Sequence, residues 1–236
     1  MAWQWEVAER DHDIQNPTSP DKIRLLGDYL RLTPGSRVLD IACGKGAPAR
    51  LLAETYGCRI LGVEIRPTFA EAAHTRIAKA GLADLVEIRT ADASEFELEA
   101  ETWDAALCLG ASFVWGTIAD AAATLAPALR EGGFVAIGEP FWRQWPLPAT
   151  IDDDGYADLP ATVKRLEQAG FATTGIIAAS QDDWDRYESL HWRAVEEWLA
   201  EHPDDDFRAE HERHRSEYIA FRRALFGWAI FVGRKT

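Results

Sequence analysis

The sequence of 236 residues is poor in several features, and each scarcity narrows its functions. It has three cysteines, Cys43, Cys58 and Cys108, an odd number without metal-type spacing, so we expect reduced thiols in a cytoplasmic protein. Lys and Arg number 25 against 39 Asp and Glu, and this net charge of −14 disfavours a nucleic-acid substrate because like charges repel. Long apolar runs and a signal-peptide core are lacking, so we expect no membrane segment.

Short β-branched apolar runs alternate with amphipathic helical stretches along most of the chain. This alternation predicts an α/β fold with a parallel sheet and crossover helices. Strands are expected at 37–41, 59–64, 86–89, 103–109, 134–138, 172–179 and 227–232. Helices are expected from Ser19-Pro20 until Thr33-Pro34-Gly35 ends the first one, and over 48–56, 68–80, 119–129 and 160–169.

Two further helices are expected between the last two strands, over 183–201 and 207–225, which is more than a simple connection needs. We therefore predict one domain, 1–236, with four parts. These are an N-terminal helix and candidate lid (1–33), a cofactor-binding core (34–180), a helical insertion or acceptor cap (181–226) and a last strand (227–236).

A small-residue turn follows the first strand, and two cofactors fit its pattern. Gly44 to Ala49 nearly satisfies the dinucleotide motif GxGxxG/A, and Glu64 lies 64 − 44 = 20 residues after Gly44, as in nicotinamide-binding folds. Asp40, however, ends the strand just before the turn, where it would repel a pyrophosphate and would suit an amine. Asp92 places a second acid after the third strand, and no YxxxK dyad is present.

These residues resemble the class I S-adenosylmethionine-dependent methyltransferases over about residues 20–180 and the last strand. Residues 40–46 resemble the family's glycine-rich motif, 62–65 the acid that binds both ribose hydroxyls, 92–93 the adenine contact and 109–110 the main chain near the methionine. The resemblance implies a Rossmann-like seven-stranded sheet, mostly parallel with an antiparallel last strand. It also implies S-adenosylmethionine as cofactor, S-adenosylhomocysteine as product, and as cofactor-binding residues Asp40, Ala42, Cys43, Gly44, Gly46, Glu64, Ile65, Asp92, Ala93, Leu109 and Gly110.

The chain departs from the family pattern at Ala42, which stands at the usual first glycine. We expect tolerance there because alanine adopts most of glycine's conformations with negative φ. Cys43 is more readily a packing residue than a nucleophile. The segments Asn16-Pro17, 137–144, 183–188 and 203–207 resemble a bacterial subgroup of small-molecule methyltransferases, a likeness that gives no acceptor.

Aromatic residues in the second half of the chain predict an acceptor pocket between the strand ends and the late helices. The candidate substrate-binding residues are Trp115, Phe141, Trp142, Trp184 and Tyr218. The candidate catalytic residues are Glu139, which is expected after the fifth strand, and Tyr187 and His191, which are four apart on one helix face. Tryptophans at helical spacing are more often core, and His191 fits a packing role equally well. His12 is a candidate lid residue.

Runs of adjacent carboxylates at 152–154 and 204–206 lack the spacing of a calcium loop, so no metal site is predicted. The leading hypothesis is methyl transfer to a small-molecule acceptor, without nucleic acid or membrane, by a monomer or homodimer. Two alternatives stay open: a nicotinamide-dependent oxidoreductase and a non-catalytic S-adenosylmethionine-binding module. The acceptor and the atom that receives the methyl group are not specified by the sequence.

Overall fold

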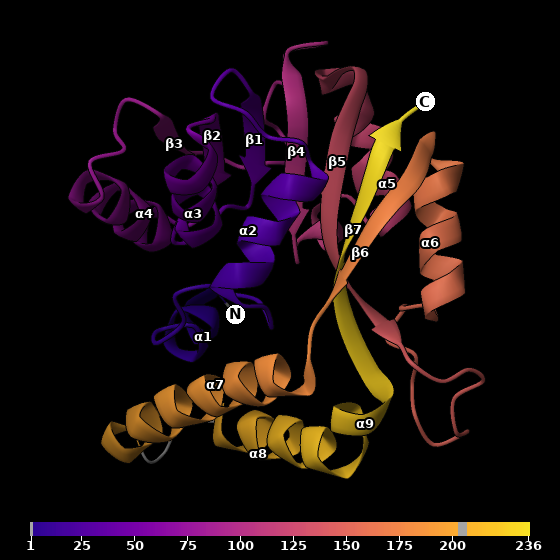
Figure 1. Cartoon of the computed structure of the whole chain (residues 1–236). Helices are drawn as coiled ribbons and strands as arrows, with labels where there is room; N and C mark the ends of the chain where they lie inside the picture. Colours follow the sequence, from indigo (N-terminus) through magenta and orange to yellow (C-terminus); the bar gives the residue numbers. More distant parts are fainter. Residues whose placement is uncertain (1, 203–206) are drawn as a thin grey trace.

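All seven strands join one sheet in the order β3-β2-β1-β4-β5-β7-β6, in a computed structural model that describes residues 2–202 and 207–236 (Figure 1). The strands are β1 (Arg37–Ile41), β2 (Arg59–Glu64), β3 (Val86–Thr90), β4 (Trp103–Leu109), β5 (Leu129–Trp142), β6 (Phe171–Ala178) and β7 (Phe226–Lys235). The first five pair in parallel, whereas β7 runs antiparallel to both β5 and β6. The predicted mixed sheet with an antiparallel last strand is confirmed.

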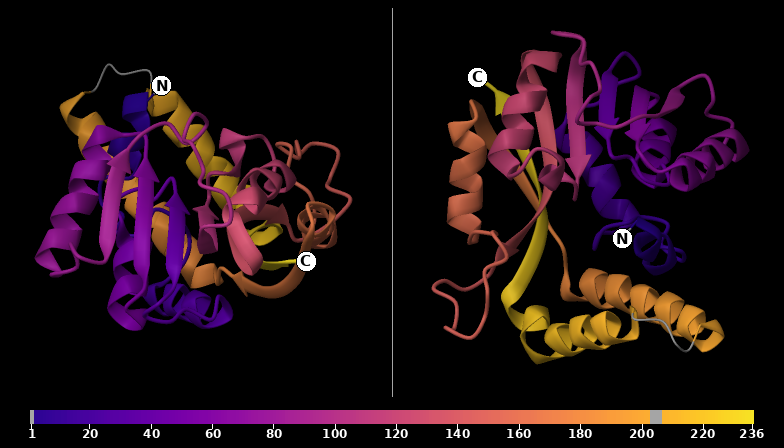
Figure 2. Two further views of the ribbon diagram at one scale, coloured as in Figure 1. Left: turned by 90° about the horizontal axis from the view of Figure 1, so that it is seen from above. Right: turned by 180° about the vertical axis from the view of Figure 1, so that it is seen from behind.

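Helices cover both faces of this sheet (Figure 2). The helices on the sheet are α2 (Pro20–Tyr29), α3 (Ala47–Tyr56), α4 (Pro67–Lys79), α5 (Ile118–Leu125) and α6 (Leu159–Gln168). Apolar side chains of α2, α3 and α4 pack in one buried cluster on the first face, and those of α5 and α6 pack in a second cluster on the opposite face. The two clusters hold the carboxyl ends of β1, β2 and β4 in fixed positions.

A helical cap lies between β6 and β7, as predicted, and we define it as α7 (Gln181–Glu201), α8 (Phe207–Glu217), a π-helical turn (Tyr218–Arg222) and α9 (Arg223–Leu225). Ser180 and Asp183 form a reciprocal capping box that starts α7. Figure 1 shows α7 and α8 running beneath the carboxyl ends of the strands, with α1 (Ala2–Ala8) beside α7. The predicted second helix over 207–225 is therefore interrupted by the π turn, and α1 was not predicted.

Strand β5 extends further than the predicted 134–138 because β7 pairs with it from Phe134 to Trp142. This antiparallel partner adds ladder hydrogen bonds beyond the reach of the parallel strand β4. Glu139, Phe141 and Trp142 consequently lie within a strand rather than in the loop expected after it.

The remaining boundaries follow local chemistry. The helix predicted over 119–129 ends at Leu125 and continues as a 3₁₀ turn, Ala126–Ala128, where Pro127 has no amide hydrogen to donate. The acidic run at 204–206 and most of the 203–207 segment lie outside the described residues. No helix of the described chain is long and apolar enough to cross a bilayer.

Candidate functional site

The turn after β1 places three residues in the left-handed region of backbone conformation. Ala42 has φ of 55°, Gly44 of 56° and Gly46 of 71°. The expectation that Ala42 would keep a negative φ is therefore wrong: it adopts the glycine-type conformation, at a cost of about 1–2 kcal/mol relative to glycine. Gly46 caps the N-terminus of α3, so the turn aims backbone N–H groups toward the carboxyl edge of the sheet.

Glu64 at the end of β2 is bound to this turn through its carboxylate. Its Oε2 accepts the N–H of Gly44 at 2.9 Å, and its Oε1 accepts the N–H of Arg66 at 2.8 Å. Burial raises the pKa of Glu64, whereas these two hydrogen bonds lower it. The acid predicted to bind ribose hydroxyls is thus oriented by the backbone of the turn itself.

Asp40 at the end of β1 is a buried carboxylate, 2% exposed, with an unused hydrogen-bonding atom. Its Oδ2 has no hydrogen-bond partner among the residues that the structure describes. Burial, aided by the nearby charge of Glu64, raises the pKa of Asp40 to about 7. A bound cation such as an amine would supply the missing partner, whereas a pyrophosphate would add charge of the same sign. Asp40 therefore fits an amino-acid group of a cofactor.

Other predicted cofactor residues line the same edge. Asp92 follows β3, is exposed, and accepts hydrogen bonds from the N–H of Ser94 at 2.8 Å and from its hydroxyl at 2.7 Å. Ile65 is 56% exposed although the five residues before it in β2 are buried, which leaves an apolar side chain free beside Glu64. Ala93 lies beside Asp92 and is half-buried. An apolar side chain and two acids at one sheet edge suit a nucleoside.

Two further predicted residues, Leu109 and Gly110, end β4 and contact the N-terminal segment. Asn16 Nδ2 donates to the Leu109 carbonyl at 3.0 Å. Gly110 has φ of 84°, and a Cβ at this position would lie 2.3 Å from Asn16 Oδ1. Cys43 is buried against Gly62, and burial raises its thiol pKa well above the usual value, which supports packing rather than nucleophilic chemistry.

The N-terminal segment between α1 and α2, residues 9–19, crosses the glycine-rich turn. Gln15 Oε1 accepts the N–H of Lys45 at 2.8 Å. The Lys45 ammonium donates to the carbonyls of Glu9 at 2.6 Å, Arg10 at 2.9 Å and His12 at 3.2 Å. These contacts bind the candidate lid to the turn through a residue inside the motif, Lys45, which the sequence analysis did not assign.

A cavity of about 390 Å³ lies between the sheet and the cap. Its lining residues are Trp5, Asp154, Tyr156, Trp184, Tyr187, Glu188, His214, Tyr218, Arg222 and Phe226. Trp184, Tyr187 and Tyr218, which the sequence analysis singled out, are brought together here. The other seven were missed, although Glu188 lies one helical turn after Trp184, a spacing that places both on one face of α7.

Several predicted acceptor residues lie elsewhere. Trp142 is 0% exposed, its indole donates to the Asp153 carbonyl at 2.9 Å, and its ring lies 4.6 Å from that of Phe226. It supports the cavity wall from behind and does not contact a ligand. Phe141 packs against Phe231 at 6.2 Å in the core on the α5 and α6 face. Both assignments are corrected because β5 extends through these positions.

Glu139 is buried within β5 and is absent from the cavity's lining residues. Its side chain accepts a short hydrogen bond from the Ser112 hydroxyl, and burial raises its pKa to about 7. Glu139 shares a face of β5 with Ile137 and Phe141, which pack in the α5 and α6 cluster. The predicted position after the fifth strand is therefore wrong, because the strand continues past Glu139.

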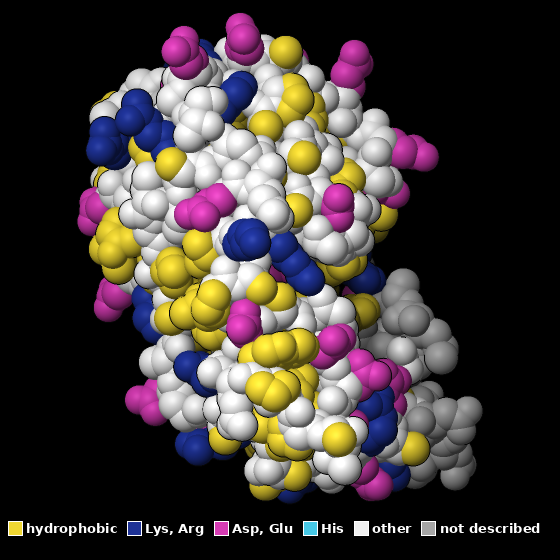
Figure 3. Space-filling model, turned by 90° about the vertical axis from the view of Figure 1, so that its right-hand side faces the viewer, with side chains coloured by type: hydrophobic (Ala, Val, Ile, Leu, Met, Phe, Trp, Pro, Cys, Tyr) yellow, Lys and Arg dark blue, Asp and Glu magenta, His cyan; other side chains and the backbone are white. Residues whose placement is uncertain are grey.

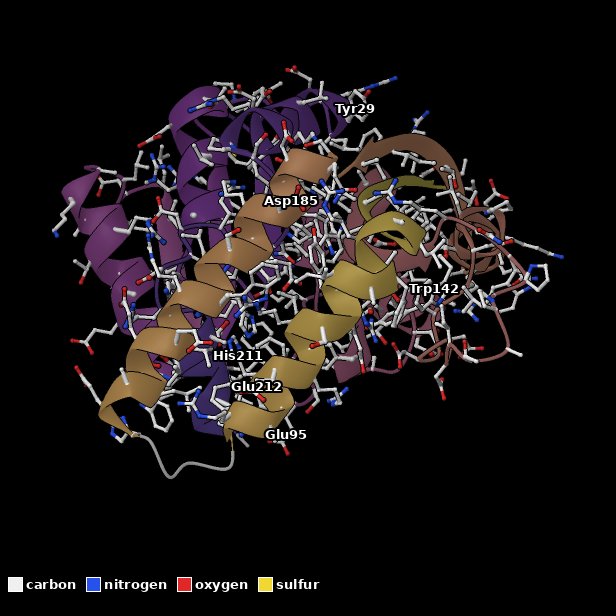
Figure 4. All side chains as sticks on the ribbon, turned by 90° about the horizontal axis from the view of Figure 1, so that it is seen from below. Tyr29, Glu95, Trp142, Asp185, His211 and Glu212 are labelled. Carbon is white, nitrogen blue, oxygen red and sulfur yellow. The ribbon has the colours of Figure 1, made fainter. Side chains whose placement is uncertain are left out.

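Trp115 and His191 also lie away from the cavity lining. Trp115 follows the 3₁₀ turn Ser112–Val114 and packs half-buried against the α5 side of the core. Helices α7 and α8 lie side by side (Figure 4). His191 of α7 stacks on His214 of α8 with ring centroids 5.2 Å apart, and burial lowers the pKa of His191 to about 3. So weak a base does not suit general-base catalysis near neutral pH.

Comparison with known proteins assigns this chain to a protein family. Residues 38–133 match the family model described as a methyltransferase domain. A solved structure of an S-adenosylmethionine-dependent methyltransferase from Geobacter sulfurreducens, in complex with S-adenosylhomocysteine, is 31% identical with a TM-score of 0.91, and the match covers 100% of this chain and 99% of that one. The chain belongs to the S-adenosylmethionine-dependent methyltransferases.

The chain is also similar to other proteins over most of its length. The Escherichia coli protein YjhP is 34% identical over 239 residues, 96% of this chain and 95% of its own. The 27-O-demethylrifamycin SV methyltransferase of Amycolatopsis mediterranei is 30% identical over 73% of this chain and 65% of its own. The methyltransferase is an enzyme whose cofactor is S-adenosylmethionine, and the nicotinamide alternative is thereby set aside.

Proposed function

We propose that this methyltransferase transfers the methyl group of S-adenosylmethionine to a small-molecule acceptor held in the cavity between the sheet and the cap. The observation that carries the proposal is the link between the two sites. Glu9 accepts a hydrogen bond from the Tyr187 hydroxyl of the cavity at 2.6 Å, and its carbonyl accepts the Lys45 ammonium of the turn at 2.6 Å. A cavity of about 390 Å³ falls at the small end of ligand sites, roughly 300–1,000 Å³. The named rifamycin relative also supports a small acceptor.

The cofactor would be held by the turn and its neighbouring strand ends. Asp40 would pair with the amino group of the methionine part, and Glu64 would accept hydrogen bonds from the ribose hydroxyls. Asp92 and Ala93 would meet the adenine, with Ile65 beside it. The main chain of Ala42 to Gly46 and of Leu109-Gly110 would contact the methionine part. S-adenosylmethionine supplies a methyl carbon on a positively charged sulfur and leaves as S-adenosylhomocysteine after transfer.

The protein's part in the reaction is positioning and the exclusion of water, which supply much of the rate of such transfers. Trp184 and Tyr218 would hold the acceptor, with Tyr187 as the one predicted catalytic residue that lines the cavity. Its hydroxyl donates to Glu9, which fixes its position, and burial raises its pKa well above the usual value, so it acts as a hydrogen-bonding group. Glu139 and His191 are not among the lining residues of this cavity, so we assign them no contact with the acceptor.

The first experiment is a calorimetric titration of the purified protein with S-adenosylhomocysteine, with NADH as a control, followed by acceptor screening with labelled S-adenosylmethionine. Micromolar binding of S-adenosylhomocysteine alone and label transfer to a small molecule are the expected results. Firm binding with no transfer across a broad acceptor panel would instead favour a non-catalytic binding module. Preference for NADH would overturn the cofactor site.

The cellular setting is part of the same proposal. The three cysteines are free and buried, which suits the reducing cytoplasm. A net charge of −14 disfavours a nucleic-acid acceptor, and we retain a monomer or homodimer as the expected assembly. Sedimentation analysis of the purified protein directly measures whether it is a monomer or a homodimer.

A further inference from the structure

Glu188 is a carboxylate in the lining of the cavity, and one of its two oxygens lacks a hydrogen-bond partner among the described residues. It lies on α7, is 3% exposed, and its Oε2 has no hydrogen-bond partner in the described part of the chain. The indole of Trp192 lies near enough to lower the pKa of Glu188 but makes no hydrogen bond to Oε2, and Nδ1 of His214 is 3.6 Å from Oε2, beyond hydrogen-bond distance. A buried carboxylate oxygen without a hydrogen-bond donor lowers the stability of the folded protein unless a ligand supplies the missing donor.

The positive charge near Glu188, on Arg222, lowers the pKa of its carboxyl but is shared with other acids. Arg222 also lines the cavity, but it pairs with Asp154 at 2.6 Å and with Glu217 at 3.4 Å. Burial lowers the pKa of His214 to about 4, so this ring is neutral at pH 7. Glu9 adds a further acid nearby. The cavity therefore favours a positively charged ligand over a neutral or negative one.

Aromatic rings enclose the same space. Trp184 lies at the centre of the group, with ring centroids 6.2 Å from Tyr187, 6.3 Å from Tyr218 and 6.0 Å from Phe226. Such rings present a negative face to a cation while burying an apolar body. On the side of the molecule in Figure 3, hydrophobic side chains gather in the lower half, at the level of the cap.

We propose that the acceptor is a small amine, whose ammonium group is held by the Glu188 carboxylate against the ring of Trp184. Because an ammonium nitrogen has no lone pair, one N–H proton would pass to the Glu188 carboxylate before transfer. The freed lone pair would then form the bond to the methyl carbon as the bond from that carbon to sulfur breaks, and S-adenosylhomocysteine would leave. The inference rests on the proposed function, because it names the class of molecule that the same cavity takes. Burial raises the pKa of Glu188 to about 8, so the empty cavity favours the protonated acid, and an ammonium ligand would restore the charged form. Glu188 is thus the residue that selects the acceptor class.

The test compares matched amines, alcohols and carboxylates on protein saturated with S-adenosylhomocysteine. The probes are benzylamine, 2-phenylethylamine and tryptamine, beside benzyl alcohol, 2-phenylethanol and tryptophol, and beside benzoate, phenylacetate and indole-3-acetate. Calorimetry should show at least one amine binding about tenfold or more tightly than its alcohol, with the carboxylate weakest. If no amine binds, or if amine and alcohol bind equally, the proposal is overturned.

Two variants attribute the preference to its residue. Glu188→Gln keeps the size of the side chain and should lose the preference for the amine over the alcohol. Glu196→Gln is the matched control, because Glu196 lies on the same helix with a side chain 46% exposed and should keep the preference. A preference that persists in a folded Glu188→Gln protein would contradict the proposal. If that variant does not fold, the comparison of amine and alcohol on the unmodified protein still decides.

The first titration separates this inference from the proposed function. If the protein fails to bind S-adenosylhomocysteine, the cofactor site and the proposed function fall together. If it binds S-adenosylhomocysteine but shows no preference for amines, the acceptor class alone is wrong and the cavity serves another kind of molecule.

Discussion

The turn after β1 and the cavity under the cap are two parts of one site built in different ways. The turn draws its groups from a few consecutive residues and from the ends of adjacent parallel strands, and many of them are backbone groups. The cavity draws side chains from α1, the loop after β5, α7, α8, the π turn and β7. A cofactor shared by many enzymes is bound by backbone geometry, whereas an acceptor particular to one enzyme is met by side chains on a variable insertion.

The turn and the cavity are also connected by hydrogen bonds. Whether cofactor and acceptor are nevertheless recognised separately can therefore be tested. Lys45 and Gln15 connect the turn to the N-terminal segment, and Glu9 and His12 of that segment contact Tyr187 of α7. If recognition of cofactor and acceptor is separate, changes in the turn should alter binding of S-adenosylhomocysteine and changes in the cap should not. The following predictions are ordered from the largest expected effect.

Replacement of Asp40 with asparagine should weaken S-adenosylhomocysteine binding by roughly tenfold to a hundredfold, the usual value of a hydrogen bond to a charged group. The substitution keeps the shape of the side chain but removes its charge. Calorimetry measures the change, and Glu87→Gln on the exposed edge of β3 is the control, with no change expected. Equal affinity in the two variants would refute the assignment of Asp40.

Gly46→Ala should lower the free energy of unfolding by about 1–3 kcal/mol and weaken cofactor binding. A Cβ there would lie 2.9 Å from the Cβ of Ala73, and φ is already 71°. Gly81→Ala is a matched control, since it has φ of 70° with nothing within 4 Å in the described structure. The difference between the two variants in chemical denaturation isolates the close contact from the backbone strain.

Binding of S-adenosylhomocysteine should strengthen by about tenfold from pH 6 to pH 8, because Asp40 must lose its proton, with a pKa of about 7, to pair with an amine. The free energy of unfolding of the unliganded protein should change in the opposite direction and fall as the pH rises. Since burial raises this pKa above its unfolded value, the folded state binds the proton between about pH 4 and 7, and stability falls as the pH rises through that window. Asp40→Asn should flatten the binding trend, which titration at each pH would measure. Thermal melts should show only a smaller fall in stability with pH, because Glu139 and Glu188, whose pKa values burial raises to about 7 and about 8, contribute in the same direction.

Lys45→Met should weaken cofactor binding by a few-fold and loosen residues 9–19, because the ammonium no longer bonds three carbonyls of that segment. Hydrogen exchange should accelerate in this segment. Lys79→Met, at the exposed end of α4, should leave both unchanged. Unaltered exchange in the Lys45 variant would mean that the segment is held to the turn by its other contacts.

Ala42→Gly should have the smallest effect, a gain of at most about 1 kcal/mol in the free energy of unfolding. Glycine relieves the strain of φ at 55°, but part of the gain is offset by its greater freedom in the unfolded chain. Thermal denaturation measures the change. A clear loss of stability would show that the alanine methyl group makes contacts that outweigh the strain.

The turn after β1 was predictable because most of its functional groups belong to residues that are close together in the sequence. Asp40, Gly44, Gly46 and Glu64 stand at fixed spacings that a strand followed by a tight turn requires, and the structure brings them together as expected. The same is true of the strands and of the cap helices, whose apolar periods set their type. Only Ala42 deviated, because a short motif does not reveal which of its residues adopts a positive φ.

The cavity was predictable only in part, for a physical reason. The aromatic residues of α7 were found from their spacing, but Phe141 and Trp142 were misplaced because pairing with β7, more than eighty residues later in the chain, extends β5 and buries them. By itself the sequence determined the fold class and the cofactor motif, since both depend on local periodicity and backbone geometry. Tertiary structure alone decided that Oε2 of Glu188 has no hydrogen-bond partner among the described residues and lies beside aromatic rings, because burial and pairing depend on packing between distant segments.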